Sequence, residues 1–300
     1  MLRRALLPGL GLAALTLVPP PARLAPQPPQ DGGLVTEHVA GHVSMLVGRG
    51  GNIAVSVGDD GALLVDDKFP DLTDAILASV GELTDGPVRW VVNTHWHGDH
   101  TGGNANLARA GATLVAHDNV RLRLSTSQDR GGEVSPPAPE DAWPRVTFDE
   151  GLSLHVNGDT VRVFHVDPAH TDGDSVVHFE GADVVHMGDT FFNGMYPYID
   201  VSSGGHLPGL VAAADRVLAR CDEDTRIIPG HGPVGDADDL RAYRDMLATV
   251  HERLLVFLEE GKSLEEVVAA EPTADLDEVW GGGYFRAADF LGFAYTSLQR

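Results

Sequence analysis

Three histidines and one aspartate stand within six consecutive residues of the segment NTHWHGDHTGGN, which covers positions 93–104. His95 and His97 are separated by one residue, so their imidazoles can reach a common point. Asp99 and His100 follow closely enough to reach a second point nearby. Two metal ions about 3.5–4 Å apart would use all four side chains at once. Because zinc prefers about four ligands and keeps one position open in catalytic sites, the chain must supply further ligands elsewhere.

Three further candidate ligands stand in turns that contain glycine or proline, each directly after a predicted strand. They are His170 in VDPAHTDGDS, Asp189 in VHMGDTFF and His231 in IIPGHGPVG. In such turns a side chain can stand at the edge of a sheet without crowding from helical neighbours. The ends of strands are also where open α/β sheets place their binding sites. The complete set of candidate ligands therefore predicts a centre for two metal ions rather than one.

The order of these residues resembles the metallo-β-lactamase fold superfamily of dinuclear hydrolases, over about residues 33–235. The resemblance implies an α/β fold, an αββα sandwich in which two mixed β-sheets pack face to face with helices on the outer faces. It assigns one ion to His95, His97 and His170, and the other to Asp99, His100 and His231, with Asp189 bridging the two. The expected ions are divalent zinc, with iron or manganese as alternatives, since nitrogen and oxygen ligands accept all three.

The resemblance also implies a mechanism. A hydroxide held between the ions would be nucleophilic near neutral pH and would attack a carbonyl carbon. One ion would stabilise the developing oxyanion, while Asp99 would orient the hydroxide and carry a proton to the leaving group. The predicted function is a metal-dependent hydrolase that opens a lactam, ester or related carbonyl bond, as a β-lactamase does. The alternatives are a lactonase or thioesterase of the same fold, and a non-hydrolytic iron or redox protein.

The residues after Asp189 bear on the substrate. In β-lactamases of this fold the corresponding position is often a cysteine, followed by a lysine that holds the substrate carboxylate. Here Phe192 stands three residues after Asp189, which argues against that way of anchoring a β-lactam. Aspartate at the bridge instead resembles branches that act on thioesters, lactones or phosphodiesters. The C-terminal segment is acidic, which disfavours a glutathione thioester, because thioesterases of this type usually carry basic residues there.

Several other residues have both a functional and a structural interpretation. Asp66 and Asp67 end the strand pattern ALLVDD, where they either accept a hydrogen bond from a metal-bound imidazole or face solvent. An apolar substrate pocket, or alternatively the ordinary core, is expected to contain Phe191, Phe192, Tyr196, Tyr198 and Trp143. Two aspartates, Asp172 and Asp174, are expected to hydrogen-bond the turn that carries His170. Of the remaining histidines, His117 and His251 are expected on the surface, whereas His206 has both a structural interpretation and a possible contact with the substrate.

The chain alternates short strand patterns with helices. The segment NIAVSVGDDGALLVDDKF predicts two strands joined by a turn at Asp60-Gly61. Helical spacing begins at Asp71, recurs at about 208–220 and dominates from about 236 to 298. Residues 125–145 lack periodicity and are rich in proline, glycine and serine, which predicts a surface loop or flap.

Three regions follow from this reading. Residues 1–30 have a basic start, a short apolar run and a proline-rich spacer, which predicts a signal peptide and a periplasmic or secreted protein. Ala22 and Ala25 are both candidate cleavage positions, and an uncleaved N-terminal anchor is the alternative. Residues 33–235 are predicted to form the metallo-β-lactamase-like domain, and residues 236–300 a helical extension packed on it.

Composition limits the partners. The 300 residues carry 21 lysines and arginines against 44 acidic residues, a formal net charge of −23. Such a surface does not suit nucleic acid, so the expected partner is a small-molecule substrate, with no stable membrane association once the leader is removed. Cys221 is the only cysteine, which excludes an intramolecular disulfide and a thiolate metal cluster. Nothing in the pattern indicates a particular oligomeric state.

Overall fold

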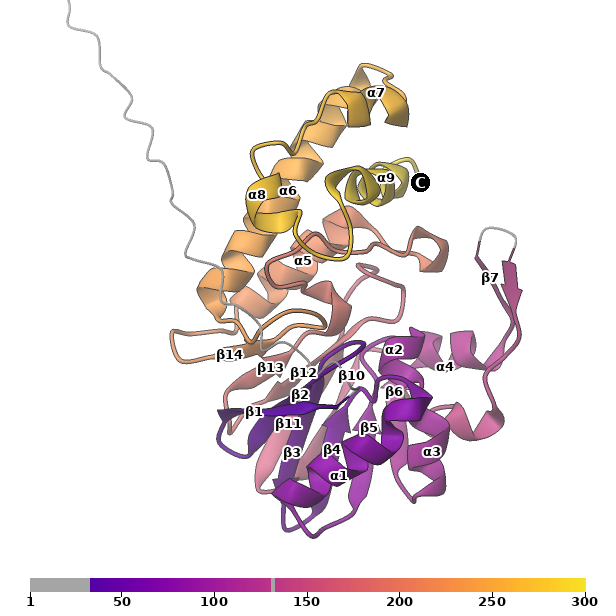
Figure 1. Ribbon diagram of the computed structural model, residues 1–300, viewed down its shortest axis with the longest axis vertical. Coiled ribbons are helices and arrows are strands. Elements are labelled where there is room, and N and C mark those ends of the chain that lie inside the picture. Colours follow the sequence, from indigo (N-terminus) through magenta and orange to yellow (C-terminus); the bar gives the residue numbers. More distant parts are fainter. Residues whose placement is uncertain (1–32, 131–132) are drawn as a thin grey trace, which may run out of the picture.

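Two β-sheets stacked face to face form the centre of the molecule in the computed structural model, which describes residues 33–130 and 133–300 (Figure 1). The predicted leader at 1–30 lies outside the described residues. The seven-stranded sheet contains, in order, β1 (Val35–Ala40), β2 (Val43–Val47), β3 (Ile53–Gly58), β4 (Gly61–Val65), β5 (Val88–Val92), β6 (Thr113–His117) and β9 (Val146–Phe148). The five-stranded sheet contains β10 (Gly151–Val156), β11 (Asp159–His165), β12 (Ser175–Phe179), β13 (Val184–His186) and β14 (Arg226–Ile228).

Both sheets are mixed, as predicted. Strands β1 to β4 pair antiparallel, whereas β4, β5, β6 and β9 run parallel to one another. In the second sheet β10 to β13 pair antiparallel and β14 joins β13 in parallel. Alternate side chains of each strand point into the space between the sheets. That inner core includes Val43, Met45, Leu63, Val65, Val92, Val161, Val163, Val177 and Phe179.

Helices cover the outer face of each sheet. On the seven-stranded sheet, α1 (Thr73–Leu83) buries Ile76 and Val80, which are spaced by one helical turn, and α3 (Asn104–Arg109) buries Leu107. Figure 1 shows these helices in front of the indigo and purple strands. The other helices of this half are α2 (Gly98–Thr101) and α4 (Asp118–Ser125). The predicted αββα sandwich is therefore confirmed.

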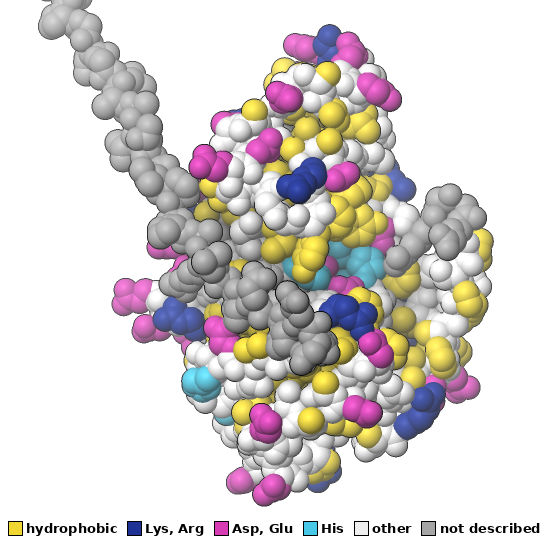
Figure 2. Space-filling view, viewed as in Figure 1, with side chains coloured by type: hydrophobic (Ala, Val, Ile, Leu, Met, Phe, Trp, Pro, Cys, Tyr) yellow, Lys and Arg dark blue, Asp and Glu magenta, His cyan; other side chains and the backbone are white. Residues whose placement is uncertain are grey.

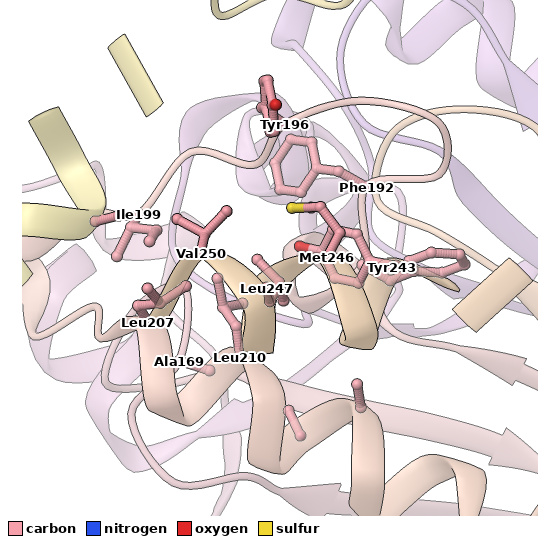
Figure 3. Packing of buried hydrophobic residues seen from close by; sticks show 14 of the residues in the cluster. Ala169, Phe192, Tyr196, Ile199, Leu207, Leu210, Tyr243, Met246, Leu247 and Val250 are labelled. Carbon is pink, nitrogen blue, oxygen red and sulfur yellow. The ribbon is translucent and has the colours of Figure 1, made fainter. Parts of the chain in front are cut away.

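The C-terminal part of the chain is helical, as predicted. It contains α6 (Ala237–Glu259), α7 (Leu264–Ala269), α8 (Asp277–Trp280) and α9 (Ala287–Ser297). A capping box formed by Asp236 and Asp239 starts α6. This helix packs on α5 (Leu207–Leu218), and Figure 3 shows Leu247 and Val250 of α6 lying beside Leu207 and Leu210 of α5.

The same hydrophobic cluster extends from α5 and α6 to α9 and to the segment after β13. Phe290 of α9 stacks on Tyr196 with ring centroids 4.6 Å apart. The C-terminal helices therefore share one core with the segment that follows Asp189. The division into 33–235 and 236–300 stays a prediction. Among the described residues, no helix is both long enough and apolar enough to cross a membrane.

The segment 125–145 is more ordered than the sequence predicts. Strands β7 (Gln128–Arg130) and β8 (Glu133–Ser135) pair antiparallel, with Gln128 opposite Ser135, and the turn η2 (Glu140–Ala142) follows. This hairpin projects beside α4 (Figure 1). Strands of three residues are too short to show an alternating pattern, which is why the sequence indicated only a loop.

Candidate metal centre

The loop after β5 carries the first four candidate ligands. Its strand lies between β4 and β6 in the parallel part of the sheet, so the loop leaves the sheet at the carboxyl edge. Asn93 fixes the loop, because its amide Nδ2 donates a hydrogen bond to the carbonyl oxygen of His100 over 3.2 Å. The side chains of His95, His97 and His100 are buried, and that of Asp99 is one-quarter exposed.

Short turns at the ends of the second sheet carry the other three ligands. Asp174 accepts hydrogen bonds from the backbone N–H groups of His170, at 2.6 Å, and Thr171, at 2.8 Å, which confirms the expected role of Asp174. Asp189 lies in η3 (Gly188–Thr190), after β13. His231 follows β14 and precedes Gly232, whose φ of +105° favours glycine.

The fold brings all seven predicted residues into one site. They form two groups within which the ligand atoms lie no more than 4.8 Å apart: His95, His97, His170 and Asp189, and Asp99, His100 and His231. Asp189 lies between the groups. Its Oδ2 is 3.4 Å from Nε2 of His170 and 3.5 Å from Nε2 of His231, and its Oδ1 is 3.1 Å from Nε2 of His100. This is the position that a bridging ligand requires.

Several inward-facing atoms of these groups make no hydrogen bond, although charged neighbours lie close to them. Within the described part of the chain, Nε2 of His95, Nε2 of His100 and Oδ1 of Asp189 are buried without a hydrogen bond. Buried polar atoms are nearly always paired, because leaving them unpaired costs roughly 1–3 kcal/mol each. Imidazole nitrogens and a carboxylate that converge on one point are donors suited to divalent cations such as zinc. The residues therefore fit a metal centre.

The outward-facing nitrogens of four candidate ligands do have partners. Asp66 Oδ2 lies 2.7 Å from Nδ1 of His100, and Asp200 Oδ2 lies 2.9 Å from Nε2 of His97. The carbonyl oxygen of Tyr198 is 2.9 Å from Nδ1 of His170, and Oγ1 of Thr94 is 3.0 Å from Nδ1 of His95. Such contacts fix the tautomer and the ring orientation of a metal ligand.

These contacts settle the two interpretations of the acids after β4. Asp66 is completely buried and contacts a candidate ligand, so it does not face solvent. Asp67 is equally buried but accepts a hydrogen bond from the backbone of Gly103 at 2.9 Å and contacts no imidazole. Asp200 could not be recognised as a partner of His97 from the sequence. The pattern DVSS around it signals only the cap of η4 (Val201–Ser203), not its proximity to His97.

Charges within the site balance one another. Burial works against an ionised Asp189, but the surrounding histidines, His100 above all, hold the pKa of Asp189 well below its ordinary value. Burial also works against protonated His231, yet Asp189 and Asp99 raise the pKa of His231 to about 9. Burial and neighbouring imidazoles lower the pKa of His95 well below its ordinary value. The carboxylates therefore attract positive charge to the point that a divalent cation would occupy.

Comparison with known proteins agrees with this geometry. Residues 46–257 match the model of the metallo-beta-lactamase superfamily. The chain belongs to this superfamily.

Two curated members of the superfamily illustrate the range of relatives. The chain is 32% identical over 180 residues to a hydroxyacylglutathione hydrolase of Anaeromyxobacter dehalogenans, covering 59% of each chain. It is 21% identical over 188 residues to the metallo-beta-lactamase type 2 of Bacteroides fragilis, covering 62% of this chain and 71% of that one. The chain thus spans less than two thirds of the first of these relatives.

Solved structures of the superfamily share the fold. A metallo-beta-lactamase from Pontibacter korlensis is 20% identical, with a TM-score of 0.60 over 72% of this chain and 99% of that one. The sec-alkylsulfatase Pisa1 from Pseudomonas sp. is also 20% identical, with a TM-score of 0.65 over 88% of this chain and 50% of that one. At these identities the likeness shows the fold alone.

In this superfamily member, the candidate ligands lie at the base of an aromatic pocket. A cavity of about 540 Å³ is lined by His97, Asp99, Asp189 and His231 together with Phe69, Phe192, Tyr198, Tyr284, Phe285 and Arg49. Figure 2 shows histidine side chains in a hollow flanked by hydrophobic side chains. Phe192 stacks on His231 with centroids 5.1 Å apart, and Tyr284 meets the same ring edge-on at 5.4 Å.

The aromatic predictions were therefore correct in part. Phe192 and Tyr198 line the pocket, whereas Phe191 and Tyr196 are buried in the core and Trp143 packs in a separate cluster with Trp96. Tyr284 and Phe285, which were not predicted from the sequence, reach the pocket from the segment between α8 and α9. No local pattern could have indicated a contact between residues so far apart in the chain.

Two predictions about other residues were wrong, those for His117 and Asp172. His117 is buried rather than on the surface, because its ring stacks on His165 at 3.8 Å and caps α4. For His206 the structural interpretation holds, because this residue starts α5 and lines a different cavity with Arg300, away from the candidate ligands. Asp172, expected to support the His170 turn directly, instead forms a two-pronged ion pair with Arg123.

Proposed function

We propose that the protein is a hydrolase that uses two divalent metal ions, zinc in the first instance, to cleave a carbonyl ester, thioester or lactone with an apolar substituent. One observation carries the proposal. Seven side chains suited to bind metal form two groups at the base of an aromatic pocket, and Asp189 lies within reach of both groups. His95, His97 and His170 would hold one ion, and Asp99, His100 and His231 the other. Bound ions of this kind lower the pKa of water towards neutrality and polarise a carbonyl group.

Asp99 is the residue proposed to move a proton. Its carboxylate lines the pocket, and its Oδ2 lies 3.4 Å from Nε2 of His231. Burial works against its ionisation, but His100 and His231 lower the pKa of Asp99 below its usual range. The carboxylate is therefore ionised, which is the form that can accept a proton during the attack on the carbonyl and return it to the leaving group.

The pocket favours an uncharged substrate. Among the described residues that line it, Arg49 alone carries a fixed positive charge, and this guanidinium is already paired with Asp71 and lies over the ring of Phe69. The rings of Phe192, Tyr198, Tyr284 and Phe285 can bury the apolar part of an acyl or alcohol group. Hydrolysis of a β-lactam is the second candidate, supported by the 21% identical relative in Bacteroides fragilis.

The test is hydrolysis by the purified, zinc-loaded protein of p-nitrophenyl esters, acyl thioesters, lactones and a chromogenic cephalosporin, with and without chelator. We expect chelator-sensitive turnover of the esters or thioesters and little turnover of the cephalosporin. Asp99→Ala should lose most of that turnover while keeping at least one metal ion. Turnover that survives both chelation and Asp99→Ala would refute the proposal. A protein that binds iron in preference and hydrolyses none of these substrates would support the redox alternative.

We also propose that the protein is exported, on the basis of residues 1–30. These residues lie outside the described part of the chain, so this proposal rests on the sequence pattern alone. N-terminal sequencing of the protein from the periplasmic fraction tests it. A mature N-terminus near Ala22 or Ala25 is expected, and an intact Met1 in the cytoplasmic fraction would refute it.

A further inference from the structure

Lys68 is a buried lysine that the proposed chemistry does not use. It is one of two lysines in the sequence, and its exposed fraction is 0%. Lysine is almost never fully buried unless its ammonium is paired. Among the described residues Lys68 forms no salt bridge, and its Nζ donates a hydrogen bond to the carbonyl oxygen of Gly51. The side chain thus joins the segment after β4 to the loop between β2 and β3.

The segment that carries Lys68 is fixed to the first ligand loop. The backbone N–H of Asp67 donates to the carbonyl oxygen of His100 at 3.0 Å, and the carbonyl oxygen of Lys68 accepts from Gly102 at 2.8 Å. Asp66 and Lys68 have φ values of 67° and 55°, a region that residues other than glycine adopt rarely. Such backbone is kept only where its surroundings hold it, which here are the loop of His100 and the contact with Gly51.

The backbone of Gly51 packs against the ring of one candidate ligand, His100. A Cβ atom at this position would lie 2.1 Å from Cε1 and 2.4 Å from Nε2 of His100, so the glycine backbone packs directly on the imidazole. Its N–H also donates to the carbonyl oxygen of Asp99 at 3.3 Å. A displacement of Gly51 would therefore change the space available to the His100 ring.

The same loop reaches the turn of the third ligand in this group. The side chain of Asn52 donates to the carbonyl oxygens of Pro229 and Gly232, at 3.0 and 2.9 Å, on either side of His231. Its backbone N–H donates to Gly230 at 2.7 Å. The loop held by Lys68 thus contacts Asp99, His100 and the His231 turn.

We propose that Lys68 is a positioning residue for the Asp99, His100 and His231 group, acting through its hydrogen bond to Gly51. This inference rests on the metal centre proposed above. Without that bond the loop can move away from the His100 ring and from the His231 turn. The other group, His95, His97 and His170, has its own supports in Thr94, Asp200 and Tyr198 and should be affected less.

The test compares Lys68→Met, which removes the donor, with Lys68→Gln, whose shorter side chain keeps an N–H group. Lys262→Met is the matched control, since Lys262 is 40% exposed and pairs with Glu266 on the surface. Each full-length protein is stripped of metal and titrated with zinc against a chromophoric chelator, and its cobalt(II) absorption spectrum is recorded. We expect Lys68→Met to bind one ion normally and the other about 10- to 100-fold more weakly, with an altered cobalt spectrum. Lys68→Gln should recover part of the affinity, and Lys262→Met should match the wild type.

A folded Lys68→Met protein that binds both ions with wild-type affinity would overturn the inference. If that variant does not fold, Gly51→Ala tests the same contact from the other side, because it keeps Lys68 but displaces the His100 ring. Selective loss of one ion in Gly51→Ala is expected, and unchanged binding of both ions would overturn the inference. Wild-type protein that binds two ions but hydrolyses nothing would refute the proposed function alone. Wild-type protein that binds no metal would refute both.

Discussion

Nδ1 of His100 lies 2.7 Å from Oδ2 of Asp66, and both side chains are completely buried. The same carboxylate accepts hydrogen bonds from the backbone and the hydroxyl group of Thr94, at 2.7 and 2.8 Å. Thr94 in turn contacts His95. One carboxylate thus orients a ligand of one group directly and a ligand of the other through a single intermediate residue.

Replacing Asp66 with alanine should therefore lower the affinity of the protein for both metal ions, not for one. Loss of such a supporting carboxylate typically costs about 10- to 100-fold in metal affinity. Asp66→Asn should lose less, because asparagine can still accept from Thr94 and tolerates the positive φ of 67°. Zinc titration measures the effect, with the exposed Asp85→Asn as control. Wild-type affinity in Asp66→Ala would contradict the expectation.

Removal of metal should lower the thermal stability of the protein. An ion present at 100 times its Kd adds about 2.7 kcal/mol to the free energy of unfolding. For a domain of this size that corresponds to a rise in Tm of roughly 5–10 °C. Calorimetry with and without zinc measures the shift. Asp189→Ala is the control, because it removes the residue shared by both groups and should abolish most of the shift. Equal Tm values for wild-type protein in zinc and in chelator would count against the metal centre.

Tyr284→Ala should change substrate preference with little effect on stability. The side chain is 68% exposed, so its removal should alter the free energy of unfolding by no more than about 0.5 kcal/mol. Its ring nevertheless lines the pocket beside His231. We expect KM to rise several-fold for long or aromatic acyl esters and to stay constant for acetyl esters. Leu255→Ala, on the exposed side of α6, is the control. A uniform effect across the ester series would show that Tyr284 does not contact the acyl group.

Lys68 should make stability depend on pH. Burial lowers the pKa of Lys68 from its ordinary value of 10.5 to about 7 in the folded protein, an effect that Asp99 and Asp66 partly offset. The unfolded chain therefore binds the proton more tightly, and the contribution of Lys68 to stability rises as pH rises from about 7 to 10.5. The slope for one group approaches about 1.4 kcal/mol per pH unit within that window.

Urea unfolding of metal-free wild-type protein and Lys68→Met at several pH values measures this slope. The free energy of unfolding of the wild type minus that of the variant should increase from pH 7 to pH 10. Below pH 7 the difference should level off. A difference that is constant from pH 6 to pH 10 would show that the ammonium is not disfavoured by burial.

The ligand set could be predicted from sequence because each ligand stands in a short segment of recognisable type. His95 to His100 are contiguous, and His170, Asp189 and His231 each follow a strand pattern. The supports of these ligands could not be predicted in the same way. Asp200 contacts His97 although 103 residues separate the two, and Lys68 contacts Gly51 although β3 and β4 separate them in the chain. Only the packed structure reveals such contacts.

The errors have a similar origin. His117 stands at the polar end of a strand, where a surface position is the ordinary expectation. Its burial depends on His165 of the other sheet, whose ring stacks on the ring of His117. Likewise Tyr284 belongs to an acidic, glycine-rich segment whose position over His231 is set by α8 and α9. Local spacing carries no information on such pairs.

The ligands are spread along the chain, from His95 to His231, and this spread sets an order of assembly during synthesis. The ribosome releases the segment 95–100 more than one hundred residues before His231. A nascent chain therefore contains His95, His97 and His100 long before Asp189 has been translated. The complete centre forms only after β14 has joined the second sheet. The complete metal centre of this protein should therefore form late, only after the chain through His231 has folded.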